Sequence, residues 1–216
     1  MLQELTPITP VNFFQLSADL LYLGEAGSFP RLTGRNGDKF LLPDTAMLCD
    51  EASFADVAMG WNREGIECFF RVNQVIERCY YPDVSKGDSV ELFIDTRNVK
   101  TSGHNTRFCH HFFFLPEAVE GIQAGELTHF RTEDRHDLCD SSLLKVKMKK
   151  RASGYDLHAW IPKECLVGYE PDQFKQMGFT YRVNRNYWES QHFSVTTGDY
   201  RLEEQPSLWS QLRFLK

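Results

Sequence analysis

Segments in which apolar and polar residues alternate with a period of two are the feature that most constrains the fold of this chain. In an extended strand successive side chains point to opposite faces, so this alternation is typical of a half-buried β-strand. Residues 89–95 (SVELFID) show the pattern, because Val90, Leu92 and Ile94 fall on one face. We predict a strand here, with its apolar face toward a core.

Similar segments recur along the chain and are separated by turn residues. They lie at residues 56–61, 66–73, 106–115, 143–151, 155–161, 177–184 and 207–214. Residues 62–65 (NREG) end in glycine between two of these segments and predict a β-hairpin. Pro116 and Pro162 are expected to end the strands before them, and Pro162 also suits the start of a short helical turn. Residues 117–140, rich in charge and histidine, are interpreted as a less regular insertion.

No long amphipathic helical pattern interrupts these predicted strands. We therefore predict an all-β protein, an antiparallel β-sandwich of two sheets, immunoglobulin-like or jelly-roll-like, with short helical turns in its loops. A closed barrel is the alternative. Residues 1–45 are less patterned and are interpreted as an N-terminal extension that packs on or completes the sandwich, and residues 46–216 as the sandwich domain.

Charge and hydropathy narrow the classes of function. The formal net charge of −6 disfavours a broad surface for nucleic acid. No apolar stretch approaches the roughly 18 residues of a membrane helix, and the first residues carry no basic leader. We therefore predict a cytoplasmic protein that binds neither nucleic acid nor membrane, with export by another route left open. The six cysteines include no CxxC pair and are expected to be free thiols.

Several motifs, in the same order, carry a resemblance to a known family. They are residues 57–65 (VAMGWNREG), 88–95 (DSVELFID), 154–162 (GYDLHAWIP), 177–184 (MGFTYRVN) and 206–212 (PSLWSQL). This series resembles the family-9 carbohydrate-binding modules and the related DOMON-like sandwiches, although His158 stands where the family motif carries glutamate. The closest resemblance is to uncharacterised bacterial members with D-T-R and then R-F-C-H-x-F-x-F-L-P, as at residues 95–97 and 107–116 here.

The resemblance implies a non-catalytic, carbohydrate-binding-like domain whose ligand is a saccharide or a similar polyhydroxylated molecule. Strand parity indicates a site, since Arg107 and His111 fall opposite the apolar side of their segment, as do Arg182 and Asn184. Amide and guanidinium groups bind sugar hydroxyls, while an aromatic ring packs on the apolar side of the sugar. The predicted ligand-binding residues are Arg97, Arg107, His111, Arg182, Asn184 and Trp188, with Trp61 as a second candidate for an exposed tryptophan.

Other classes of function are weighed against this one. The chain has no G-x-S-x-G elbow and no phosphate-binding loop, so we predict that it is not an enzyme. The alternative function is a protein-interaction or structural domain that binds a partner chain through a sheet face or edge. A haem or metal carrier is a third hypothesis, with His111 and either Met148 or His158 as axial ligands.

No cofactor and no metal site are predicted. Asp88, Glu91 and Asp95 have the oxygen ligands that structural calcium prefers, but Glu91 and Asp95 lie about 13 Å apart along an extended strand. We expect Asp88 to cap a turn and Glu91 to pair with a basic neighbour, one of Arg97, Arg107 and Arg182.

Two histidine-containing groups are also considered. The first offers zinc ligands at a spacing too loose to predict a site, and comprises His104, Cys109, His111 and His129. The second is a local basic patch that we interpret as a solvated loop, and comprises His129, Arg131, Arg135 and His136.

Overall fold

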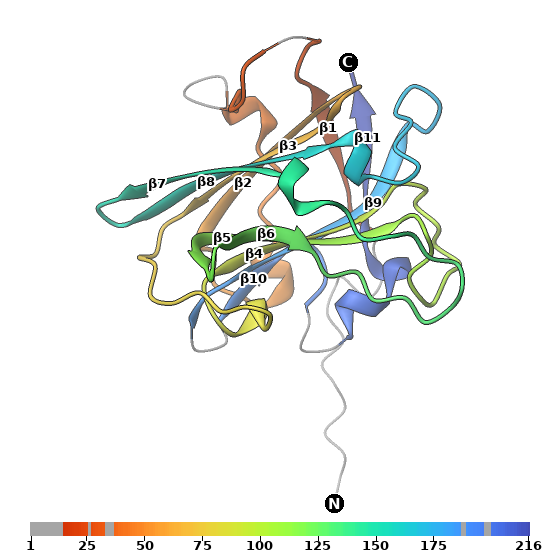
Figure 1. Cartoon of the computed structure of the whole chain (residues 1–216). Helices are drawn as coiled ribbons and strands as arrows, with labels where there is room; N and C mark the ends of the chain where they lie inside the picture. The colour runs from red at the N-terminus through yellow and green to blue at the C-terminus, as the bar shows by residue number, and fades with distance from the viewer. Residues whose placement is uncertain (1–14, 26, 33–36, 187–188, 197–199) are drawn as a thin grey trace, which may run out of the picture.

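The computed structural model describes residues 15–25, 27–32, 37–186, 189–196 and 200–216 (Figure 1). The strands in these residues are β1 (Ser17–Tyr22), β2 (Ala55–Asn62), β3 (Gly65–Val72), β4 (Ser89–Asp95), β5 (Cys109–Val119), β6 (Ile122–Glu126), β7 (Lys145–Arg151), β8 (Gly154–Pro162), β9 (Gln176–Asn184), β10 (Ser190–His192) and β11 (Ser210–Leu215). Short 3₁₀ turns lie at Asp38–Phe40, Ala46–Cys49, Val84–Lys86, Ser141–Leu143, Lys163–Cys165, Leu202–Glu204 and Pro206–Leu208. The prediction of an all-β protein with short helical turns in its loops is confirmed. Within the described residues, no helix has the length and apolar character to cross a membrane.

The described strands belong to one hydrogen-bonded sheet. Its order is β6-β5-β4-β9-β11-β1-β2-β3-β8-β7, and β10 pairs with β9 beside this path. Most neighbours are antiparallel, but β1 runs parallel to both β11 and β2. The prediction of two antiparallel sheets is thereby corrected to one mixed sheet, because the backbone of β1 bonds to strands on both sides of it.

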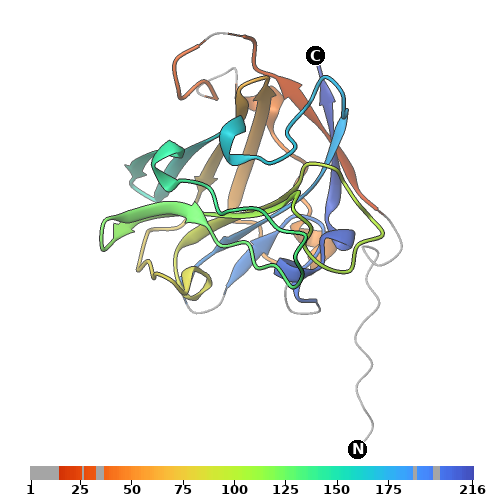
Figure 2. The same cartoon turned by 45° about the vertical axis from the view of Figure 1, so that its right-hand side comes forward.

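This sheet curls so that two layers face each other. β6, β5, β4, β9 and β11 form one layer, and β2, β3, β8 and β7 form the other. Figures 1 and 2 show the layers on either side of the interior, with β1 and β11 joining them at one side. The sheet is therefore nearly closed into a barrel, with β6 and β7 as its edges.

Period-two alternation decides which side chains meet between the layers. Val90, Leu92 and Ile94 of β4 are fully buried in the main core, as predicted, and they share that core with Met59 of β2 and Leu157 of β8. The opposite face of each layer therefore points outward and is partly covered by loops.

Two predicted boundaries were wrong. β5 does not end before Pro116 but continues through it to Val119. Its pairing with β6 shifts register between Phe114 and Val119, and a proline, which has no N–H to donate, is tolerated where the ladder is irregular. β6 itself lies inside residues 117–140, which were expected to be irregular.

Candidate functional site: a buried glutamate network and an outward-facing pocket

Glu91 of β4 is the centre of a buried hydrogen-bond network on the outward face of its layer. Because β4 pairs with β9 in the register Glu91↔Arg182, the guanidinium stands beside the carboxylate and donates from Nε to Oε1 and from Nη2 to Oε2, both at 2.9 Å. Asn184 Nδ2 donates to Oε1 at 2.6 Å, and His111 Nε2 lies 2.7 Å from Oε2. The predicted pairing of Glu91 with a basic neighbour is confirmed, and that neighbour is Arg182.

The charges of this network compensate one another. Burial alone would raise the pKa of the Glu91 carboxyl, but the attraction of Arg182 and the hydrogen bonds of His111 and Asn184 lower that pKa to about 2. Glu203 accepts a further hydrogen bond from Arg182 Nη1 at 2.8 Å. The structure thus brings Arg182, Asn184 and His111 together, with their donors occupied by carboxylates of the protein.

The other predicted ligand-binding residues lie apart from this network or cannot be placed. The guanidinium of Arg97 lies 4.9 Å from the ring centre of Phe108 and 3.7 Å from that of Phe174. Arg107 precedes β5 and forms an exposed ion pair with Asp134. Trp188 lies outside the described residues.

The candidate tryptophan Trp61 is a core residue. It is 1 % exposed, and its Nε1–H donates to the Leu215 carbonyl at 3.1 Å. The expectation of an exposed ring at this position was therefore wrong, because β2 turns Trp61 toward the interior. Asp88, in contrast, accepts hydrogen bonds from the backbone N–H groups of Glu77 and Arg78 at 2.7 Å, as expected of a turn cap.

The structure does not bring together the residues of the haem hypothesis. His111 stacks on Phe93 with 4.3 Å between ring centres, on the outward face of one layer. Met148 packs against the main core between the layers. His158 of β8 alternates with the core residues Leu157 and Ala159 and so points outward from the other layer.

Polar side chains also gather on the outward face of the second layer. Cross-strand register aligns one row over four strands, consisting of Asp56, Arg71, Asp156 and Lys149. The next row on the same face consists of Ala58, Phe69, His158 and Lys147. Alternate residues of a strand share a face, so both rows point away from the core.

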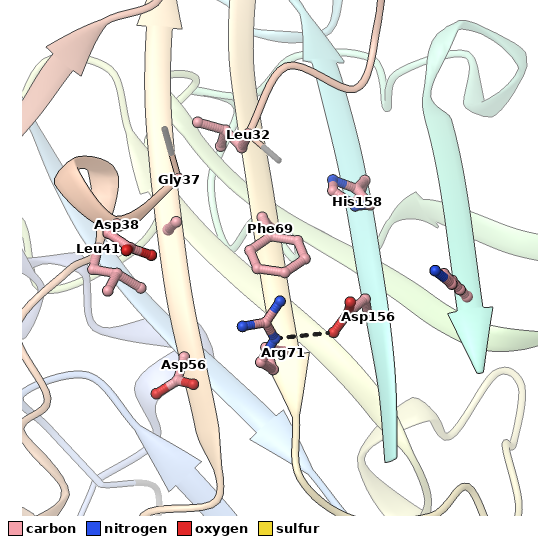
Figure 3. Close-up of a pocket in the computed structure, with 11 residues that line it drawn as sticks. Leu32, Gly37, Asp38, Leu41, Asp56, Phe69, Arg71, Asp156 and His158 are labelled. Atoms are coloured by element: carbon pink, nitrogen blue, oxygen red, sulfur yellow. Dashed lines mark hydrogen bonds and ion pairs between the residues drawn. The ribbon is translucent and has the colours of Figure 1, made fainter. Parts of the chain in front are cut away.

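All residues of these two rows except Lys147 form the floor of a pocket of about 340 Å³. That volume is at the lower end of the range for small-molecule sites. Residues of the loop before β2 form the remaining wall, namely Leu32, Gly37, Asp38 and Leu41 (Figure 3). The pocket therefore combines an aromatic ring and aliphatic groups with charges of both signs.

Phe69 lies on the pocket floor between Leu32 and Arg71 (Figure 3). The Phe69 ring centre is 4.7 Å from the His158 ring centre, and the Arg71 guanidinium lies 5.5 Å from the Phe69 ring centre. Arg71 Nε donates to Asp156 Oδ1 at 3.3 Å. Burial lowers the pKa of His158, which favours the neutral form of its imidazole at pH 7. The half-buried Phe69 is thus flanked by a cation and a neutral ring.

A second pocket, also of about 340 Å³, lies on the same face. Trp160 lines it, with the Arg31 guanidinium 5.3 Å from the Trp160 ring. Buried Glu67 holds the loop at this point by accepting from the Leu32 N–H at 2.9 Å and from Arg31 Nε at 3.2 Å. Phe29 lines this pocket and contacts the His158 ring of the first.

None of these pocket residues was predicted to bind a saccharide, and only His158 was considered, as a haem ligand. The sequence nevertheless contains a signal for the pocket. Glu67, Phe69 and Arg71 alternate with core residues in β3, which places an aromatic ring on a charged outward face. The wall formed by the loop before β2 had no such signal, because only the folded chain brings it over the strands.

Comparison with known proteins finds likeness in structure and not in sequence. Neither a protein-family model nor a curated protein matches the chain in sequence. A family-9 carbohydrate-binding module from Caldicellulosiruptor kristjanssonii in complex with glucose matches with a TM-score of 0.65 and 14 % identity, over 93 % of this chain and 96 % of that one. A family-9 module from the same organism in complex with cellotriose matches with a TM-score of 0.64 and 14 % identity, over 92 % of this chain and 93 % of that one.

A third structure is that of a candidate carbohydrate-binding protein from Bacteroides uniformis. It matches with a TM-score of 0.55 and 10 % identity, over 93 % of this chain and 98 % of that one. At such identities the likeness shows the fold alone. None of these three structures is described as a DOMON-like domain, so that part of the resemblance stays a prediction. The chain shares the fold of the family-9 carbohydrate-binding modules.

Proposed function

We propose that the chain is a non-catalytic domain that binds a saccharide in the pocket of about 340 Å³ lined by β2, β3, β8 and β7. The observation that carries the proposal is the Phe69 ring on the floor of a pocket bordered by charged side chains. The apolar side of a sugar ring packs on such an aromatic ring, while charged groups bind its hydroxyls. The complexes of the same fold with glucose and cellotriose support this class of ligand.

A physical reason favours this pocket over the network of sequence-predicted residues. Arg182 and His111 are buried and bonded to Glu91, so a ligand there must break these bonds and leave a buried charge without its partner. Asp56 and Lys149 are exposed, and neither has a hydrogen bond or ion pair within the described parts of the chain. Their groups gain hydrogen bonds to a sugar without losing others.

Isothermal titration calorimetry with glucose, cellobiose and cellotriose tests the proposal. Phe69→Ala is expected to weaken binding about two- to tenfold, since one aromatic stacking contact contributes about 0.5–1.5 kcal/mol. Arg71→Ala is expected to weaken it about tenfold or more, because hydrogen bonds to charged groups are the stronger ones. Arg107→Ala is the matched control and is expected to leave affinity unchanged. Both arginines form ion pairs at the surface, with side chains 48 % and 55 % exposed, but Arg107 does not line the pocket.

The opposite pattern contradicts this placement. If Arg107→Ala weakens binding while Phe69→Ala and Arg71→Ala do not, the ligand binds near the sequence-predicted residues. If none of the sugars binds at millimolar concentration, the saccharide proposal is wrong. The alternative, a partner chain on a sheet face or edge, then becomes the next hypothesis, and a pull-down tests it.

A further inference from the structure

A buried cluster of two histidines and a glutamate lies across β5 from the Glu91 network, and its residues line neither of the two pockets described above. His110 belongs to β5, Glu126 ends β6, and His136 comes from the loop that follows. All three side chains are buried, with His136 the most exposed at 6 %. Their potential ligand atoms lie within 4.8 Å of one another. Three separate segments of the chain thus converge at one point.

One carboxylate oxygen of Glu126 is the centre of this cluster. Oε1 lies 2.9 Å from His110 Nδ1 and 2.9 Å from His136 Nε2. Thr128 Oγ1 donates to the same oxygen at 2.7 Å, and the backbone N–H of Cys139 donates to Oε2 at 2.8 Å. The bonds from Thr128 and Cys139 fix the orientation of the carboxylate, as outer hydrogen bonds do at metal sites.

The two imidazoles present nitrogen atoms to the same centre. His136 Nδ1 lies 2.7 Å from the Arg107 carbonyl, and a carbonyl only accepts, so Nδ1 carries a proton and Nε2 faces Glu126. A metal-binding histidine has this arrangement, with one ring N–H bonded to a backbone carbonyl and the other nitrogen directed at the ion. His110 Nε2 is buried without a hydrogen-bond partner in the described residues. The neutral imidazole of His110 can therefore carry its proton on Nε2 without breaking an existing hydrogen bond, which leaves the Nδ1 lone pair free to bind an ion.

We propose that His110 Nδ1, Glu126 Oε1 and His136 Nε2 bind a zinc ion that fastens the loop after β6 to β5 and β6. Two imidazoles and one carboxylate are ligands that zinc accepts, whereas calcium requires oxygen ligands. The nitrogen–oxygen separations of 2.9 Å approach the edge of a tetrahedron with metal–ligand bonds of about 2.0–2.1 Å. Zinc displaces the proton between His136 and Glu126, and that proton passes to the buffer.

The residues of this cluster differ from the zinc-ligand group considered from the sequence, which comprised His104, Cys109, His111 and His129. His111 points to the opposite face of β5 and binds Glu91. His136, interpreted from sequence as part of a solvated loop, is buried against Glu126. His136 therefore provides a target and His111 a matched control, because each is a buried histidine side chain bonded to a buried glutamate.

The test is zinc binding by purified full-length protein after treatment with a chelator. We expect one equivalent of zinc by elemental analysis after dialysis, an enthalpy that depends on the buffer because a proton is released, and a rise in Tm. At a free zinc concentration about a hundredfold above Kd, the rise is about 5–10 °C for a chain of this size. Calcium at the same concentration is expected to produce no rise.

Two variants decide whether the ion occupies this cluster. His111→Gln is expected to keep the zinc equivalent, and His136→Gln to lose it, with circular dichroism confirming that both fold. No zinc uptake by the wild-type chain overturns the proposal, and so does full uptake by folded His136→Gln. If His136→Gln does not fold, cobalt in the wild-type chain decides: a tetrahedral visible spectrum abolished by zinc supports the site, and its absence overturns it.

Discussion

Replacing Glu91 by glutamine removes the charge at the centre of the buried network while keeping the size of the side chain. The pKa of Glu91 falls from an ordinary 4.5 to about 2 in the folded chain. One pKa unit corresponds to about 1.4 kcal/mol, so ionised Glu91 contributes about 3 kcal/mol to folding at pH 7. Removing one partner of a buried ion pair costs about 3–5 kcal/mol. We expect a cost at the lower end of this range, because Arg182 Nη1 still donates to Glu203 Oε1 at 2.8 Å and the side-chain oxygen of the glutamine still accepts one hydrogen bond.

Urea unfolding at pH 7, followed by tryptophan fluorescence, measures this loss as a lower midpoint. In a thermal scan it corresponds to a Tm lower by roughly 6–12 °C. Asp134→Asn is the matched control, since it removes a carboxylate from an exposed ion pair with Arg107. Exposed pairs contribute about 0–1 kcal/mol, so this variant is expected to unfold close to the wild type.

The same difference depends on pH with a sign that follows from the pKa values. The folded pKa of Glu91 lies below its unfolded value, so its contribution is present above the unfolded pKa and is lost as pH falls from about 5 to about 2. Somewhat less than half of this contribution is lost by pH 3.5. The reasoning is refuted if Glu91→Gln is as stable as the wild type at pH 7, or if the difference between them does not shrink at pH 3.5.

Two further predictions concern the sheet. Gly65→Ala is expected to destabilise the chain by more than about 1 kcal/mol in urea unfolding. Gly65 has a φ of +149°, and an added Cβ would lie 2.2 Å from the Ile161 carbonyl oxygen. Gly103→Ala is the control and should unfold like the wild type, because an added Cβ there meets nothing within 4 Å. Leu20→Ala should lower the free energy of unfolding by about 2–5 kcal/mol in the same assay, since Leu20 of β1 is fully buried in the core. A decrease of less than about 1 kcal/mol would contradict the central place of β1 in the sheet.

The sequence predicted those parts of the fold that depend on neighbours along the chain. Alternation alone predicted β4 and its inward face of Val90, Leu92 and Ile94. It also predicted the β2–β3 hairpin, because residues 62–65 provide a turn between two strands. It did not predict β6, whose residues IQAGE lack a strong apolar face and depend on pairing with β5.

Long-range pairing explains the rest of the difference. The parallel partners of β1 are residues far away in sequence, and no local pattern encodes them. The predicted site shows the same limit. Parity correctly put Arg182 and Asn184 opposite the core side of β9, but only the β4–β9 register shows that Glu91 lies between them. Residues selected as donors to a ligand are thus bound to a carboxylate of the protein.

The last test of the pocket uses its charged side chains that form no ion pair with the protein. Asp56 and Lys149 line it without an ion pair or hydrogen bond in the described residues. Exposed charges of this kind contribute little to stability, so Asp56→Ala and Lys149→Ala are each expected to leave Tm within about 2 °C of the wild type. If their charged groups bind sugar hydroxyls, each variant should nevertheless lose about tenfold in affinity for a sugar that the wild type binds. Calorimetry and a thermal scan on the same samples separate the two roles. A loss of Tm without a loss of affinity would show that these residues serve the fold and not the ligand.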